Sequence, residues 1–155
     1  MENLSVQTAL VPLLQNEVIH CHLLTELWQV VVFKKARNEM GIYTGGRWGS
    51  VSGRVEIGEW YVDTSVREVG EETQIRLSPD QVIVTDFSFT ALSRSGEAIH
   101  ITSCFAVLDS FNLADITFNG ELVDKRLLSF EDALDLLKKD GLPGAWESLA
   151  AVLGM

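Results

Sequence analysis

The chain has 155 residues, of which 46% are hydrophobic and 22% charged, a composition that excludes intrinsic disorder and predicts one domain spanning residues 1–155. Its 12 basic and 22 acidic residues give a net charge of −10, which argues against long nucleic acid as a partner. An acidic excess would suit a divalent cation if the carboxylates gather in one place.

The cysteines and the N-terminal segment indicate the compartment. Cys21 and Cys104 form no C-x-x-C motif, so we expect reduced, structural thiols. No basic segment precedes an apolar stretch at the N-terminus, and the apolar run from Ala9 to Leu14 is interrupted by Pro12. We therefore expect a cytoplasmic protein with no membrane partner; the sequence leaves a homodimer open.

The first part of the chain predicts strands followed by loops. Leu27 to Phe33 is a compact apolar run with three consecutive valines, which favours a buried strand. Val6 to Leu14 and Val18 to Leu24 are weaker strand candidates. A concentration of glycine between Gly41 and Gly58 predicts loops.

A helix is predicted over Trp60 to Thr73. This segment contains no Pro, and Val62, Val66 and Val69 recur at spacings of four and three residues. That spacing is the apolar stripe of an amphipathic helix.

The second part of the chain predicts a hairpin and two further helices. Gln81 to Leu92 and Ala98 to Leu108 are β-rich runs joined by a short polar segment, and Lys125 to Leu128 could add one short strand. A capping box at Ser129 opens a helix to about Asp140, and a last helix follows Pro143. These elements predict an α/β protein with a mixed sheet sandwiched between helices.

The most informative stretch is residues 53–75. It follows the pattern Gly, five residues, Glu, seven residues, Arg-Glu, an aliphatic residue, any residue, Glu-Glu, any residue, Gly and an aliphatic residue. The pattern resembles the Nudix box of the MutT-like hydrolases, and only Gln74 departs from it, where the family has Gly. The matching residues are Gly53, Glu59, Arg67, Glu68, Val69, Glu71, Glu72 and Ile75.

Three carboxylates of this box share one face of the predicted helix. At about 100° per residue, Glu68, Glu71 and Glu72 fall within roughly 100° of one another. Such a cluster repels itself, and a cation such as Mg²⁺, with Mn²⁺ as an alternative, would relieve the repulsion. The competing interpretation is a solvated face of a surface helix. The fixed offsets of the other box residues argue against it.

The resemblance implies roles for residues around the carboxylates. Arg67 would pair with Glu59 and brace the loop that leads into the helix, and Gly53 and Gly58 would supply tight backbone geometry in that loop. Many family members add one acidic metal ligand from a later loop. Glu121 is our candidate for that ligand, with Glu97 as the competitor.

Other side chains near the box or in the strands also carry expectations. Trp48, in the Gly-rich loop beside the box, is a candidate nucleobase contact. Gln74 stands where a left-handed conformation is natural, so it should distort or soften the helix exit at a cost of about 1 kcal/mol. His20, His22 and His100 have no Cys or carboxylate spaced to complete a zinc site, so we expect packed or surface histidines.

The resemblance implies a Nudix pyrophosphohydrolase. Such an enzyme uses Mg²⁺ to cleave a phosphoanhydride bond of a nucleoside diphosphate linked to another moiety, for example a nucleoside triphosphate or a nucleotide sugar. The partner would be a small-molecule nucleotide substrate, and Glu68, Glu71 and Glu72 would bind the metal. The general base would be one of these box glutamates or an acidic residue from a nearby loop. The alternative is a Nudix-fold module that senses a nucleotide without cleaving it. No subfamily signature that selects a substrate is visible.

Overall fold

The computed structural model describes residues 16–36, 46–92, 96–118 and 122–154. Within these residues a seven-stranded mixed sheet has the order β3-β2-β1-β6-β5, with β4 paired to β1 and β7 paired to β2. The β1–β6 pair is parallel and the other pairs are antiparallel. The strands are β1 (Glu17–Thr25), β2 (Gln29–Lys35), β3 (Trp48–Gly49), β4 (Val51–Arg54), β5 (Val82–Leu92), β6 (Ala98–Leu108) and β7 (Leu122–Ser129).

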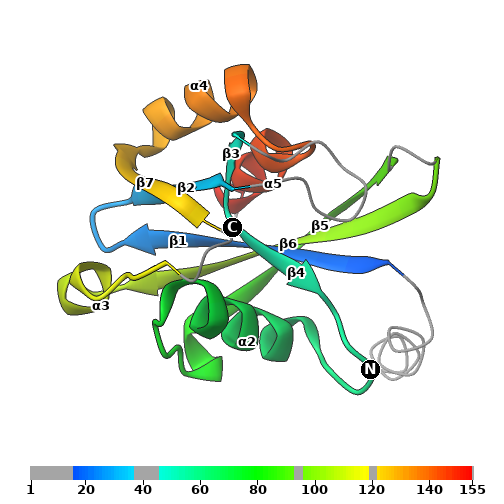
Figure 1. Ribbon diagram of the computed structural model, residues 1–155, viewed down its shortest axis with the longest axis horizontal. Helices are drawn as coiled ribbons and strands as arrows, with labels where there is room; N and C mark the ends of the chain where they lie inside the picture. Colours follow the sequence, from blue (N-terminus) through cyan, green and yellow to red (C-terminus); the bar gives the residue numbers. More distant parts are fainter. Residues whose placement is uncertain (1–15, 37–45, 93–95, 119–121, 155) are drawn as a thin grey trace.

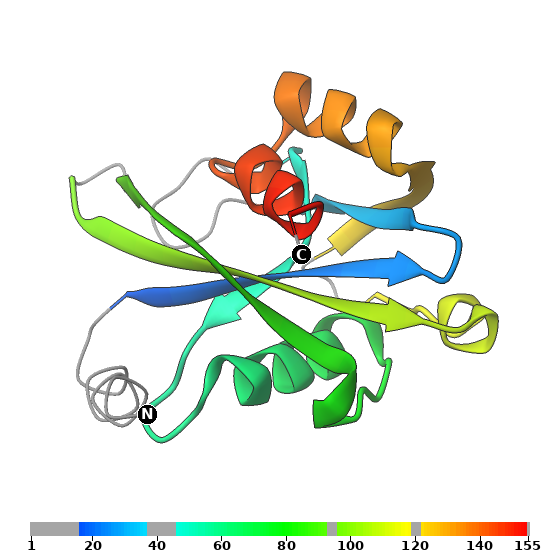
Figure 2. The same cartoon turned by 180° about the vertical axis from the view of Figure 1, so that it is seen from behind.

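Helices cover both faces of the sheet, as the sequence predicts. Helix α2 lies on one face, while α4 and α5 lie on the other (Figure 1), and the reverse view shows the same three layers (Figure 2). Among the described residues, no helix combines the length and apolar character needed to cross a membrane. The helices are α2 (Tyr61–Thr73), α3 (Ser110–Ala114), α4 (Phe130–Asp140), α5 (Ala145–Val152) and the 3₁₀ helix η2 (Pro79–Gln81).

Strand alternation divides the hydrophobic core into two layers. In β2, Val31 and Phe33 pack with the buried residues under α2, whereas Val30 and Val32 pack with those under α4 and α5. Successive side chains of a strand point to opposite faces, so the next side chain of β2 that faces α2, after Val31 and Phe33, is that of Lys35. The row of β2 side chains that faces α2 therefore ends in a lysine.

Several predicted boundaries are wrong. Strand β2 begins at Gln29, because Leu27 and Trp28 lie in the turn before it and Trp28 has a φ of 60°. The predicted loop region contains β3 and β4, which gain partners in β2 and β1 that no local pattern reveals. Strand β7 is longer than predicted, α3 and η2 were not predicted, and the predicted strand from Val6 to Leu14 lies outside the described residues.

Buried histidines hold α5 against the sheet. Nδ1 of His20 and Nε2 of His22 lie 3.1 and 2.8 Å from the Ser148 hydroxyl oxygen, and the Ser103 hydroxyl donates to the Ser148 carbonyl. Both imidazoles are buried, as expected for packed histidines. Burial lowers the pKa of each imidazole to about 3, with a smaller contribution from the charge of Lys35 at His20 and from the neighbouring His20 at His22.

These histidines should make the fold sensitive to mild acid. The unfolded chain takes up two protons near its ordinary pKa of about 6.5, whereas the folded chain does so only near pH 3. Stability is therefore fully present above pH 6.5 and falls between pH 6.5 and 3, by up to about 1.4 kcal/mol per pH unit for each histidine. Urea unfolding at pH 7.5 and 5.5 measures the slope. The matched variant His22→Gln should have a shallower slope, and an equal slope would contradict this account.

Candidate active site

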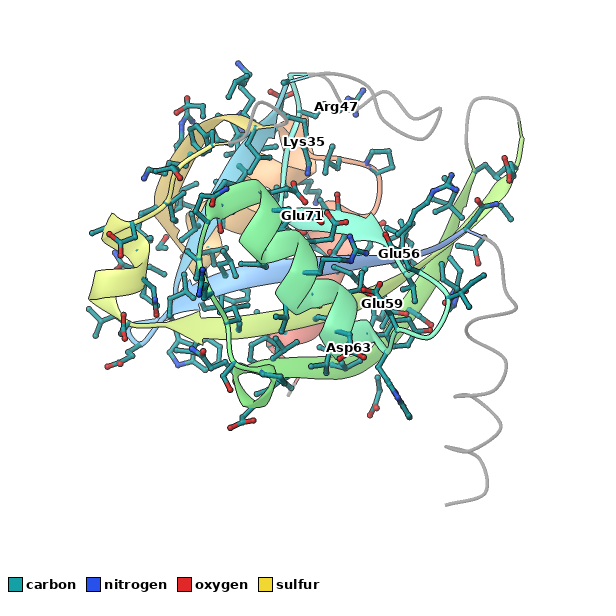
Figure 3. All side chains as sticks on the ribbon, turned by 60° about the horizontal axis from the view of Figure 1, so that its bottom comes forward. Lys35, Arg47, Glu56, Glu59, Asp63 and Glu71 are labelled. Carbon is teal, nitrogen blue, oxygen red and sulfur yellow. The ribbon has the colours of Figure 1, made fainter. Side chains whose placement is uncertain are left out.

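Helix α2 and the loop before it carry the box residues. Strand β4 ends at Arg54, Gly58 turns the loop with a φ of +87°, and α2 begins after Trp60. The Asp63 carboxylate accepts a hydrogen bond from the Trp60 backbone N–H at 2.9 Å and so caps the helix. Figure 3 shows Glu56 and Glu59 beside the first half of α2, and Glu71 near its end towards Lys35.

The expected pair between Arg67 and Glu59 is present. Arg67 donates from Nε to Glu59 Oε2 at 2.8 Å and from Nη2 to Glu59 Oε1 at 3.0 Å. These hydrogen bonds are the main reason that the pKa of Glu59 falls to about 2. Glu59 also accepts from the Glu56 backbone N–H and the Thr64 hydroxyl. The pair thereby ties the loop to the body of α2.

Arg67 also contacts the carboxylate face of α2, in addition to the predicted pair with Glu59. Its Nη1 donates to Glu68 Oε1 at 2.6 Å and lies 3.5 Å from Glu71 Oε2, while its Nη2 donates to the Arg54 carbonyl at 2.9 Å. The long side chain spans the angle that separates it from Glu68. One guanidinium therefore bridges the box loop, the end of β4 and the acidic face of α2.

Glu68 is packed against Gly53. A Cβ on Gly53 would overlap the Glu68 carboxyl group, so any side chain there would displace the carboxylate. The predicted reason for this glycine is wrong: Gly53 lies in β4 outside the left-handed region, and the space it leaves is what matters. Burial raises the pKa of Glu68, while hydrogen bonds with Glu72 and Arg67 oppose the increase.

Glu72 is fully buried beside Lys35. Lys35 Nζ lies 3.4 Å from Glu72 Oε1 and donates to the Ser52 hydroxyl at 3.2 Å. Each of the two charged side chains is only 1% exposed. The solvated-helix interpretation is therefore wrong for Glu72. Lys35 was not predicted as a site residue, although the alternation of Val31 and Phe33 along β2 places it under α2.

The donor set fits a hard divalent cation. Among the described side chains of His, Cys, Asp and Glu, no three converge into a ready-made metal cage. Mg²⁺ commonly uses one or two carboxylates and completes its shell with water and substrate phosphate. Glu68 and Glu72 supply such a pair of carboxylates, and Glu71, with 54% of its side chain exposed, lies beside them. Glu121 lies outside the described residues.

A family model for the NUDIX domain matches residues 14–152. The chain belongs to the Nudix family. Membership places it among hydrolases of phosphorus-containing acid anhydrides, as the box predicts. No curated protein sequence matches the chain.

Solved structures share the Nudix fold at low identity. A C. elegans Ap4A hydrolase, solved as a binary complex, has a TM-score of 0.62 at 16% identity over 89% of this chain and 97% of its own. An E. coli dihydroneopterin triphosphate pyrophosphohydrolase has a TM-score of 0.62 at 19% identity over 87% and 92%. A Francisella tularensis NMN adenylyltransferase/ADP ribose pyrophosphatase, complexed with AMP and a Mn ion, has a TM-score of 0.68 at 16% identity over 99% and 46%.

Trp48 is a core residue of this Nudix domain. It lies in β3 instead of the expected loop, is only 4% exposed and packs with the residues under α4 and α5. The Arg126 guanidinium stacks 4.7 Å from the ring centroid. This burial argues against the predicted contact between Trp48 and a nucleobase.

Gln74 adopts the left-handed conformation that the Nudix box usually gives to glycine. Its φ is 66° and its ψ is 10°, and its backbone N–H donates to the Gly70 carbonyl at 3.0 Å. The predicted distortion of the helix exit is therefore absent. The cost of the substitution is conformational strain at one residue, because a Cβ disfavours positive φ.

Replacing Gln74 with Gly should stabilise the protein by about 1 kcal/mol, because the backbone is already in a conformation that glycine adopts freely. Urea denaturation of the variant and of wild type measures the difference. Gln74→Ala is the matched control, since it removes the same side chain and keeps the Cβ. A glycine variant no more stable than the alanine variant would contradict the strain.

Proposed function

We propose that the protein is a Mg²⁺-dependent pyrophosphohydrolase that cleaves a phosphoanhydride bond of a nucleoside diphosphate linked to another moiety. The carrying observation is a pair of carboxylates, the half-buried Glu68 and the fully buried Glu72, held within hydrogen-bonding reach on the sheet-facing side of α2. Arg67 contacts Glu68 and Lys35 contacts Glu72, but the two carboxylates still repel each other, so this arrangement of charges has a cost. A site for a divalent cation and a polyphosphate explains why the chain maintains it.

Each box residue has a part in this proposal. Glu68 and Glu72 hold the metal ion, with Glu71 as a further ligand on the open side. When bound, Mg²⁺ polarises phosphate oxygens, activates the attacking water and offsets charge developing in the transition state. Glu68 is the best-suited proton acceptor, because burial raises its pKa towards the working pH. Arg67 positions Glu68 and, through Glu59, the loop beside it.

The structural relatives support this substrate class. They include an Ap4A hydrolase and a dihydroneopterin triphosphate pyrophosphohydrolase, and the relative complexed with AMP and a Mn ion supports Mn²⁺ as an alternative metal. Glu121 remains our proposed additional metal ligand from a later loop, and its position in the chain is the argument for it. The identity of the nucleotide and of its linked group is left open by this proposal. A cytoplasmic location and a homodimer stay predictions from the sequence.

A substrate panel tests the proposal. Wild-type protein with Mg²⁺ is incubated with nucleoside triphosphates, nucleotide sugars and dinucleoside polyphosphates, and release of nucleoside monophosphate or pyrophosphate is measured. We expect turnover of at least one class, lost in EDTA and restored by Mg²⁺ or Mn²⁺. Tight nucleotide binding by calorimetry without cleavage at any metal concentration would instead favour the sensor. No turnover of any compound by folded protein would count against the enzyme.

A further inference from the structure

Lys35 is a buried cation inside the acidic site. It is the last residue of β2, and its backbone is fixed by hydrogen bonds from its N–H to the Arg47 carbonyl and from the Gly46 N–H to its carbonyl, both at 2.9 Å. Its ammonium group contacts Glu72 and Ser52. A lysine that is 1% exposed is rare, because taking an ammonium group out of water is costly unless a charge partner is present.

The Lys35 ammonium group lies beside two sources of negative charge, the Glu72 carboxylate and the C-terminal end of α2. Glu72 supplies a full charge at 3.4 Å, and it stands in the last turn of α2, where the helix dipole is negative. That last turn contains no basic residue of its own. Lys35 therefore provides, from a neighbouring strand, the positive charge that the end of the acidic helix lacks.

We propose that Lys35 is a built-in counter-cation of Glu72, which stabilises the carboxylate face without metal and weakens its affinity for a divalent cation. The second half rests on the proposed function, in which Glu72 is a metal ligand. An ammonium group and a divalent cation on the same carboxylate repel each other, and the coupling between them must be reciprocal. Lys35 is thus a positioning residue that sets how much the fold depends on metal.

Removing the charge should expose both effects. In Lys35→Met the aliphatic stem is largely kept and Glu72 loses the positive charge beside it, so the melting temperature in EDTA should fall by about 5 °C or more. Mn²⁺ should bind about tenfold more tightly than to wild type and should restore most of the lost melting temperature. Lys35→Gln, which retains a hydrogen-bond donor, should show the same direction and serves if the Met variant does not fold.

The matched control is Lys34→Met. Lys34 precedes Lys35 in β2, lies on the opposite face of the strand and is opposite Asp124 in β7. Its replacement should leave both the melting temperature in EDTA and the affinity for Mn²⁺ close to wild type. The double variant Lys35→Met with Glu72→Gln should melt higher in EDTA than either single variant, because it removes both buried charges together.

Melting in EDTA and Mn²⁺ titration by electron paramagnetic resonance give separate readouts. The proposal is overturned if Lys35→Met and Lys35→Gln melt like wild type in EDTA, or if they bind Mn²⁺ more weakly than wild type does. If neither wild type nor any variant binds Mn²⁺, the proposed metal function fails, and so does the proposed effect of Lys35 on metal affinity. The double-variant comparison would then still report the Lys35–Glu72 pair, so the two failures can be told apart.

Discussion

Replacing Glu68 with Gln should lower turnover roughly a hundredfold or more, because it removes both a proposed metal ligand and the proposed proton acceptor. Stability should stay unchanged or rise slightly. Burial raises the pKa of Glu68 in the folded state, so its ionised form at neutral pH opposes folding, and a neutral amide removes that cost. Gln also keeps an oxygen that can accept the hydrogen bond from Arg67.

The measurement is a rate and a urea denaturation curve for Glu68→Gln on the substrate that the panel identifies. Glu26→Gln is the matched control, because Glu26 is an exposed acid in the turn between β1 and β2. The control should keep wild-type turnover and stability. Near-normal turnover in Glu68→Gln would make the box a resemblance without the chemistry.

Replacing Arg67 with Lys should lower stability and turnover together. A lysine ammonium cannot reproduce the fork that contacts Glu59, Glu68 and the Arg54 carbonyl at once. The pair is partly open to solvent, so we expect a loss of about 1 to 2 kcal/mol. Turnover should fall by roughly tenfold or more, because Glu68 and the loop before α2 lose their brace.

Arg54→Lys is the matched control, because it is the same substitution at a nearby residue whose side chain is exposed. Its carbonyl would still accept from Arg67, so stability and turnover should stay near wild type. Thermal melting and the rate on the identified substrate are measured for both variants. An Arg67→Lys variant that loses turnover but melts like wild type would contradict the bracing role and place Arg67 on the substrate.

The sequence predicted the elements whose signal is local and repeated. The valine spacing predicted α2, and the capping residue Ser129, which accepts from the Asp132 N–H at 3.1 Å, predicted the start of α4. The two-residue strand β3 and the four-residue strand β4 were missed, because their pairing partners lie in other strands. Short strands between glycines carry too few residues for a period to show.

The sequence likewise predicted part of the candidate site and missed part of it. The box predicted the Arg67–Glu59 pair, and the structure contains it. The helical spacing read from the sequence does not distinguish the three glutamates from one another, whereas tertiary packing buries Glu72 and leaves Glu71 exposed. From the sequence alone, Glu72→Gln should barely change stability. With Lys35 buried beside Glu72, the same substitution leaves the ammonium group without a counter-charge and should destabilise the fold.

The most direct test of the central claim is hydrolysis of the identified substrate in ¹⁸O-labelled water, with the products analysed by mass spectrometry and ³¹P NMR. If water attacks phosphorus at the α2 carboxylates, one phosphorylated product carries ¹⁸O on phosphorus. That labelled product should require Mg²⁺ and should nearly vanish in Glu68→Gln. Products without ¹⁸O on phosphorus, or labelled product formed at the wild-type rate by Glu68→Gln, would contradict the account.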